Sequence, residues 1–197
     1  SSVAEVEGDY EMEMEYFRPA GKNSAVNLAL LAIFTALTTI LTLAIRIPYP
    51  GTGGYFNLGD VMVMLGGLLL GPVGGFFVGG VGSAIADMIG FPVFAPITLV
   101  VKGLEGMAVG YLGSRVRGST KVNRLDVIAV IVGALIMLAG YFIGEYFMFG
   151  FAIAFGELIT INWVQVTIGG LVTLLIGPTI RSYLRTINYG EMEPEEQ

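Results

Sequence analysis

Residues 59–90 decide the fold, and they read GDVMVMLGGLLLGPVGGFFVGGVGSAIADMIG. The only ionisable residues in the stretch are Asp60, near its start, and Asp87, near its end. As a single helix the stretch would be about 48 Å long, whereas the hydrocarbon core of a bilayer is about 30 Å thick. Gly71-Pro72 interrupts it, and proline suits the first turn of a helix better than its interior. We therefore predict two membrane spans, at 58–70 and 72–90.

The composition of the whole chain is that of a membrane protein. Of its 197 residues, 54% are hydrophobic and only 13% are charged, whereas a soluble domain is nearer 25% charged. The net charge of −6 comes from the two ends, because residues 1–22 and residues 190–197 each carry −4 and the residues between them carry +2. We expect an acidic, disordered N-terminal tail (1–22), a membrane domain (23–187) and an acidic C-terminal tail (188–197).

Four more apolar stretches complete the membrane domain. They are predicted spans at 25–45, 96–113, 126–149 and 158–180, with a turn at 150–157. Basic residues cluster before the first span, between the fourth and fifth, and after the sixth. With six spans all three clusters fall on one side, which the positive-inside rule makes cytoplasmic. The predicted fold class is an all-α integral membrane protein of six transmembrane helices with both termini inside.

Several function classes are excluded by residues that the chain lacks. It has no cysteine and no histidine, which removes thiol catalysis, cysteine zinc sites, histidine-containing triads and the usual haem ligands. It has no GxxxxGK[ST] loop, so we expect any ATP hydrolysis to occur in separate subunits. We expect no catalytic residues, no bound metal, no cofactor and no nucleic-acid partner.

Polar residues inside the predicted spans gather in the outer half of the bilayer. An ionisable group in a span costs about 2.5–3.5 kcal/mol on insertion scales, so each one calls for a reason. Several lie on single helix faces; Thr98, Lys102 and Glu105, for example, stand at i, i+4 and i+7. This one-sided distribution is typical of a pocket that opens outward. The candidate substrate-binding residues are Asp60, Asp87, Thr98, Lys102, Glu105, Tyr141, Glu145, Asn162, Trp163 and Gln165. The structural alternative is an ion-pair network around Lys102 that only holds helices together.

Four segments of the chain carry a distinctive pattern: IPYPGTGGYFNLGD (47–60), LGPVGG (70–75), GSAIAD (82–87) and APITLVVKGLEG (95–106). Together they resemble a known family, the S components of energy-coupling factor (ECF) vitamin transporters. The resemblance is to the branch that takes riboflavin or hydroxymethylpyrimidine-type substrates, and it covers roughly residues 25–187.

The resemblance implies a mechanism and a set of partners. An S component captures a vitamin from outside the prokaryotic cytoplasmic membrane, with the loop after the first span covering the site. It docks on a transmembrane coupling subunit that carries two ATPases. The gating residues would be Tyr49, Tyr55, Phe56 and Asn57, and the AxxxA docking face of the first span would be Ala25, Ala29, Ala32 and Ala36.

The residues also bound what the pocket would hold. Acids outnumber bases there, and aromatic rings beside asparagine and glutamine suit a flat heterocycle with hydrogen-bond donors and acceptors. Riboflavin is favoured, with a pyrimidine thiamine precursor or a pyridoxine-like ring next, each as transported substrate rather than cofactor. The rival functions are a stand-alone ion-coupled carrier, a membrane enzyme using Asp and Glu for acid–base chemistry, and a structural membrane subunit. Saturable binding of a small molecule would rule out the last of these.

Overall fold

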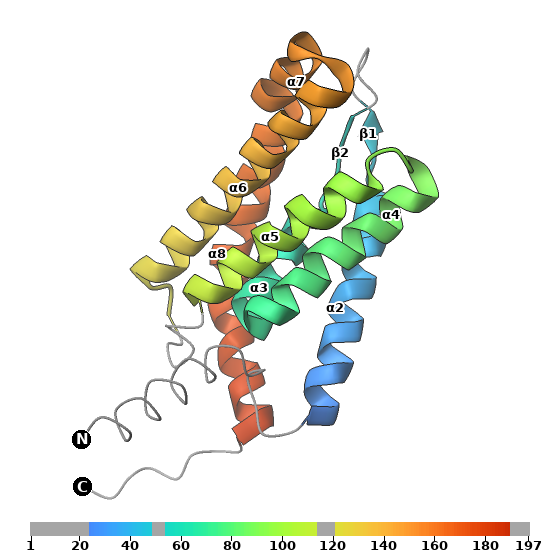
Figure 1. The fold of residues 1–197 in the computed structure, drawn as a ribbon. Helices are drawn as coiled ribbons and strands as arrows, with labels where there is room; N and C mark the ends of the chain where they lie inside the picture. The colour runs from blue at the N-terminus through green and yellow to red at the C-terminus, as the bar shows by residue number, and fades with distance from the viewer. Residues whose placement is uncertain (1–23, 49–53, 114–120, 190–197) are drawn as a thin grey trace, which may run out of the picture.

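The computed structural model describes residues 24–48, 54–113 and 121–189, and the side chains within them except those of residues 24 and 185–189. The predicted N-terminal tail, residues 190–197 of the predicted C-terminal tail, and Tyr49 lie outside the described residues. Within them the chain is almost entirely helical, as expected, with one short pair of antiparallel strands that the sequence analysis did not predict (Figure 1). The elements in order are α2 (Ser24–Ala44), β1 (Ile47–Pro48), β2 (Tyr55–Phe56), α3 (Gly59–Phe76), the π-helix η1 (Phe77–Val81), α4 (Gly82–Gly90), α5 (Ala95–Gly113), α6 (Arg124–Phe149), α7 (Phe151–Glu157), the π-helix η3 (Leu158–Asn162) and α8 (Trp163–Tyr189).

The chain folds back on itself at Gly71, as the Gly71-Pro72 sequence predicts. Gly71 has φ 81° and ψ −173°, and Pro72 opens the helical segment that follows. A β-carbon at Gly66 would overlap the Val78 side chain, although twelve residues of straight helix would separate these positions by about 18 Å. The stretch 59–90 is therefore a tight helical hairpin, and Gly71 supplies a backbone conformation that is essentially restricted to glycine.

Small residues let this hairpin lie directly on α5. A β-carbon at Gly75 would overlap the carbonyl of Gly106, and one at Gly79 would overlap the carbonyl of Lys102. Close backbone approach is how helices associate without a hydrophobic driving force between them. The hairpin is also the centre of the bundle. In its most apolar 18-residue segment 78% of the residues are buried, whereas the corresponding share in α2 is 17%.

Polar caps and a second glycine set the bounds of α6. Asn123 begins the helix by a capping box, in which its Oδ1 accepts from the Leu125 N–H at 3.1 Å and the Asp126 Oδ2 accepts from the Asn123 N–H at 2.9 Å. Gly150, at φ 89°, ends α6 and begins α7. The prediction of a turn at 150–157 is wrong, because residues 151–157 form the helix α7. The predicted end of the last span at residue 180 is too early, because α8 continues to Tyr189.

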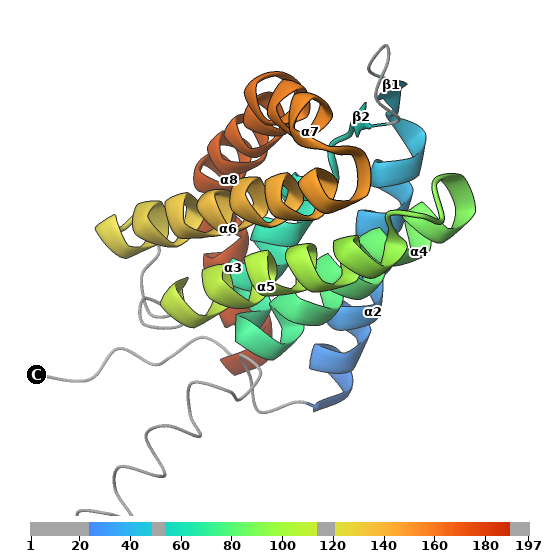
Figure 2. The ribbon, with the colours of Figure 1, turned by 45° about the horizontal axis from the view of Figure 1, so that its top comes forward.

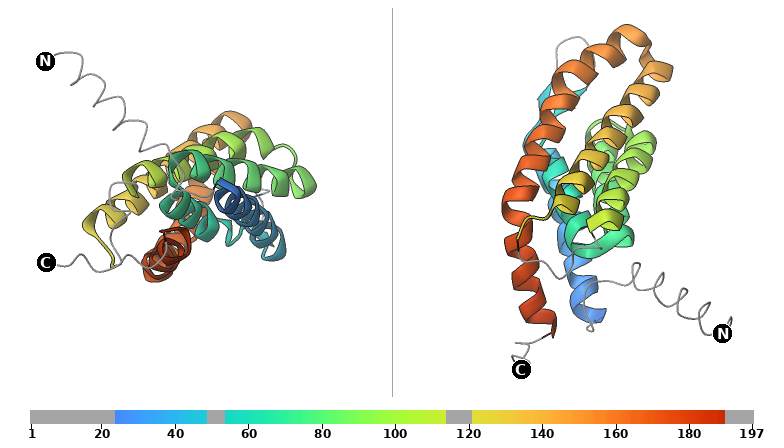
Figure 3. Two further views of the ribbon diagram at one scale, coloured as in Figure 1. Left: turned by 90° about the horizontal axis from the view of Figure 1, so that it is seen from below. Right: turned by 90° about the vertical axis from the view of Figure 1, so that its left-hand side faces the viewer.

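The helices alternate in direction, so the bundle has two distinct ends. α2 begins and α8 finishes at one end, while the strand pair, α7 and the turn between α4 and α5 lie at the other (Figures 1 and 2). We call the latter the α7 end. Side views show α8 running along the length of the bundle beside α6 (Figure 3). Within the described residues, five helical stretches are long and apolar enough to cross a membrane: Ala25–Ala44, Gly59–Gly90, Ala95–Gly113, Arg124–Phe149 and Phe151–Leu184. The six-span count and the orientation stay predictions.

Replacing Gly71 by alanine is expected to lower the free energy of unfolding by about 1–3 kcal/mol, because a β-carbon disfavours this backbone conformation. Gly156→Ala is the matched control: Gly156 lies in α7, has no atom within 4 Å of an added β-carbon, and should leave stability equal or slightly higher. Denaturation of the purified proteins in detergent measures both. Equal stability of the Gly71→Ala variant and the wild type would contradict the assigned hairpin turn.

Candidate ligand-binding site

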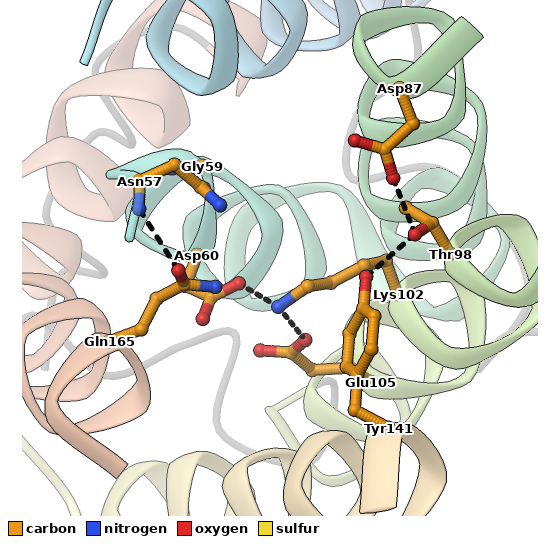
Figure 4. A network of polar contacts seen from close by, with 9 residues as sticks. All are labelled: Asn57, Gly59, Asp60, Asp87, Thr98, Lys102, Glu105, Tyr141 and Gln165. Carbon is orange, nitrogen blue, oxygen red and sulfur yellow. Dashed lines mark hydrogen bonds and ion pairs between the residues drawn. The ribbon is translucent and has the colours of Figure 1, made fainter. Parts of the chain in front are cut away.

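A buried lysine joins α3 to α5. Lys102 Nζ forms an ion pair with Asp60 and another, at 3.0 Å, with Glu105 Oε2. All three side chains are buried, and we call them the lysine cluster (Figure 4). Asp60 Oδ2 and Glu105 Oε1 are buried without a hydrogen-bond partner among the described residues. The cluster therefore holds one positive group against two acidic ones and leaves two acceptor oxygens unused.

A second polar group, the Asp87 cluster, lies beside the first and consists of Tyr55, Asp87, Thr98 and Tyr141. Figure 4 shows its Asp87, Thr98 and Tyr141 side chains. The Thr98 hydroxyl donates to Asp87 Oδ2 at 2.6 Å. Because that hydroxyl has only one proton, Tyr141 must donate to Thr98 across their 2.7 Å contact. The Lys102 ammonium lies 5.6 Å from the centre of the Tyr141 ring, which connects the two clusters by a cation–π contact.

Tyr55 ties the segment after α2 to the bundle. Its hydroxyl donates to Asp87 Oδ1, and its ring stacks on Phe91 with centroids 4.9 Å apart. Burial, together with the Asp87 carboxylate, raises the pKa of the Tyr55 phenol, so the phenol stays protonated and can donate. Arg46 lies over the Tyr55 ring at 4.8 Å and donates from Nη2 to the Ala86 carbonyl at 2.8 Å. Strand β2 is thus fixed at the α7 end by both polar and ring contacts.

Two amide side chains secure the residues between β2 and α3. The Asn57 N–H donates to Gln165 Oε1 at 3.0 Å, and Asn57 Oδ1 accepts from the Gly59 N–H at 2.8 Å. These contacts place the start of α3, and with it Asp60, beside α8 (Figure 4).

A third buried group, the α7 cluster, consists of Glu145 on α6, Glu157 at the end of α7 and Asn162 at the end of η3. Their exposed fractions are 1%, 3% and 6%. Glu145 interacts with Glu157 and Asn162 through its side chain. It lies one helical turn from Tyr141 along α6, and Asn162 lies one turn from Gln165, so this cluster adjoins the other two on the side of the α7 end.

The structure brings nine of the ten predicted substrate-binding residues into or beside these clusters, together with Tyr55 and Asn57 of the predicted gating residues. Trp163 is the exception, because it is 58% exposed. Phe56, another predicted gating residue, is half-buried in β2. The four alanines of the predicted docking face are all exposed on α2.

The sequence analysis missed Glu157 and Arg46. Glu157 stood in a stretch taken as a turn, yet it is an isolated acid between apolar residues 151–156 and 158–161, and that isolation was the available signal. Arg46 was taken only as the first residue of the segment that follows the first span. A buried ion pair at the opposite end was also missed: Arg181 bonds Asp126 through both nitrogens, at 2.8 and 3.0 Å. The end of the bundle opposite the α7 end therefore contains buried charge that the apolar pattern did not suggest.

Comparison with known proteins establishes the family. A family model described as the S component of ECF-type riboflavin transporters matches residues 22–182, which is most of the chain. This chain belongs to that family of substrate-binding membrane subunits. It is thus a component of a multi-pass membrane transporter of vitamin-type substrates, which agrees with the expectation of a transport protein rather than an enzyme.

The chain is also similar to two other proteins in sequence and to one solved structure in fold. The chain is 30% identical over 155 residues to the thiamine precursor transporter HmpT of Lactococcus lactis, which covers 78% of this chain and 86% of that one. It is 44% identical over 112 residues to an uncharacterized protein in the gap 3′ region of Pyrococcus woesei, covering 57% of this chain and 73% of that one. The fold matches a solved S component of a bacterial ECF transporter with a TM-score of 0.61 at 18% identity, covering 83% of this chain and 99% of that one.

Substitution of Lys102 by methionine is expected to lower the free energy of unfolding by about 3–5 kcal/mol, because it leaves buried carboxylates without their counter-charge. Combining it with Asp60→Asn and Glu105→Gln should recover part of that loss. Lys121→Met, a change at an exposed lysine, should have little effect. Detergent-based unfolding measures all three. If Lys102→Met proves as stable as the wild type, the lysine cluster does not hold α3 and α5 together.

Proposed function

We propose that this S component captures a hydroxymethylpyrimidine-type thiamine precursor, and that the lysine, Asp87 and α7 clusters surround it. The main support is that one carboxylate oxygen of Asp60 and one of Glu105 are buried and accept no hydrogen bond from another described residue. Buried polar atoms are ordinarily hydrogen-bonded, so these acceptors suit a ligand that brings hydrogen-bond donors. The bound precursor is cargo rather than a cofactor.

The charge balance favours an aminopyrimidine over an anionic or acceptor-rich ligand. An exocyclic amino group supplies two N–H donors, and a basic ring nitrogen can share a proton with a carboxylate. Lys102, the cation in the lysine cluster, already bonds two acids. A ligand that depended on that ammonium for its own acceptors would therefore compete with Asp60 and Glu105. The 30% identity to a thiamine precursor transporter supports the same class.

Riboflavin is the second candidate, and the description of the matching family model favours it. Its hydroxylated side chain would supply donors, but the two ring carbonyls of its flavin also need donors. The lysine cluster offers only an ammonium that is already paired. On chemistry alone riboflavin therefore ranks behind the aminopyrimidine, which reverses the preference drawn from the sequence.

The proposal includes an orientation and a docking face. Six segments would cross or enter the membrane, with both ends of the chain inside and the α7 end outside, so that the buried polar clusters lie toward the outer surface. The exposed alanines of α2, Ala25, Ala29, Ala32 and Ala36, would face the transmembrane coupling subunit of a module with two ATPases. Their small side chains permit close helix packing.

The binding proposal predicts saturable binding of 4-amino-5-hydroxymethyl-2-methylpyrimidine to the purified chain, measured by titration calorimetry. Glu105→Gln should weaken this binding by about tenfold to a hundredfold, since an acceptor for the ligand becomes an amide. The variant keeps the pairing of Lys102 with Asp60. Thr167→Val, on the exposed side of α8, serves as the control with unchanged affinity. Tighter binding of riboflavin than of the pyrimidine would refute the proposed substrate.

The docking proposal predicts that Ala32→Leu and Ala36→Leu each prevent copurification with the coupling subunit while leaving ligand affinity unchanged. The bulkier side chains would hold the helices apart. Ala44→Leu is the matched control, because Ala44 is also exposed on α2 but lies about a quarter-turn around the helix from the alanine face. Undiminished assembly of both alanine-face variants would place the docking surface elsewhere.

A further inference from the structure

The α7 cluster brings together three polar side chains that an apolar bundle would not bury without a reason. Glu145, Glu157 and Asn162 come from α6, α7 and η3 and are all at least nine-tenths buried. η3 is a π-helix, an irregularity that is frequent at functional sites. Gly54 leaves room for the Glu157 carboxyl, since a β-carbon there would overlap it. The cluster therefore lies between α6, α7 and Gly54, the residue before β2.

Glu145 and Glu157 lie against each other in the interior of the bundle. Their side chains interact, and both are almost fully buried. In the described part of the chain, no lysine or arginine forms a salt bridge with either glutamate.

Each side chain of the cluster keeps one buried atom unused. These atoms are Glu145 Oε2, Glu157 Oε1 and Asn162 Nδ2, none of which makes a hydrogen bond of good geometry to another described residue. Two of the three are carboxyl oxygens and the third is an amide donor. A hydroxyl matches both kinds of atom, because it donates one hydrogen bond, to one of the carboxyl oxygens, and can accept from the Asn162 amide. An amino group attached to an aromatic ring has no good acceptor for that amide.

We propose that Glu145, Glu157 and Asn162 form a second subsite, which takes a hydroxyl group of the captured molecule. This inference rests on the proposed function. It goes further by stating which part of the ligand each end of the site would recognise. The lysine cluster takes the donors of the ring, and the α7 cluster takes the hydroxyl. Glu157, absent from the sequence-based site, becomes a specificity-determining residue.

The register of the helices brings the two subsites within reach of one small ligand. Tyr141 and Glu145 are one turn apart on α6, and Gln165 and Asn162 are one turn apart across the start of α8. One turn of helix rises about 5.4 Å, a distance comparable to the width of a substituted six-membered ring. A hydroxymethyl group on a ring held at the lysine cluster therefore extends toward the α7 cluster.

The test compares two ligands that differ only in the hydroxyl. The first is 4-amino-5-hydroxymethyl-2-methylpyrimidine and the second is 4-amino-2,5-dimethylpyrimidine, each titrated into the full chain in detergent. The wild type should bind the first about tenfold to a hundredfold more tightly. Glu157→Leu should bind both equally, at the level of the second ligand. Glu157→Gln should retain most of the preference, because its amide keeps a carbonyl oxygen that can accept from the ligand hydroxyl.

Thr160→Val is the control, since Thr160 lies in the same π-helix and bonds the Gly156 carbonyl rather than the cluster; it should keep the full preference. The subsite proposal would be overturned if the wild type showed no preference between the two ligands. It would also be overturned if Glu157→Leu preferred the hydroxylated ligand as strongly as the wild type does. If neither pyrimidine binds, the proposed substrate is wrong. The subsite is then tested by comparing the affinity for riboflavin with that for lumichrome, which lacks the hydroxylated side chain. Binding of none of the four compounds overturns both proposals.

Discussion

The need to neutralise charge within an apolar bundle governs this structure. Lipid offers no hydrogen-bond partner to a buried ammonium, so Lys102 must find its counter-charges inside the protein. It finds Asp60 on α3 and Glu105 one turn along its own helix, α5. The pair with Asp60 joins the two helices and helps to fix how they lie against each other. The glycines at their interface allow the backbones to come close enough for the pairs to form. Packing and electrostatics thus depend on one another at the centre of the fold.

From that centre the polar contacts extend in one direction, toward the α7 end. The Tyr141 hydroxyl donates to Thr98, and the Thr98 hydroxyl donates to Asp87. Tyr55, in β2, donates to the same carboxylate. The segment after α2 is thereby fastened to the helices that would hold a ligand. A ligand that changed the contacts of Asp87 would also act on Tyr55, which links binding to the position of this segment.

Much of the architecture followed from sequence patterns with a direct physical cause. Gly71-Pro72 predicted the hairpin because the stretch 59–90 is too long for one span and proline suits the first turn of a helix better than its interior. The stripe of Thr98, Lys102 and Glu105 predicted a buried polar face on α5, because such a face cannot be turned to lipid. Glu157 could not be placed in the same way. Its role depends on the turn after Gly150, which brings α7 back toward α6, and residue spacing along one helix carries no information about that turn.

The sequence by itself determined the membrane character, the apolar segments and the residue types in the site, because each depends on composition or on the period of a single helix. Only the tertiary structure decided which groups meet. It paired Lys102 with Asp60 across 42 residues, placed Glu145 against Glu157, and turned Trp163 outward although its neighbours Asn162 and Gln165 are buried. Such pairings depend on how helices rotate and cross, and many side chains compete to set that rotation.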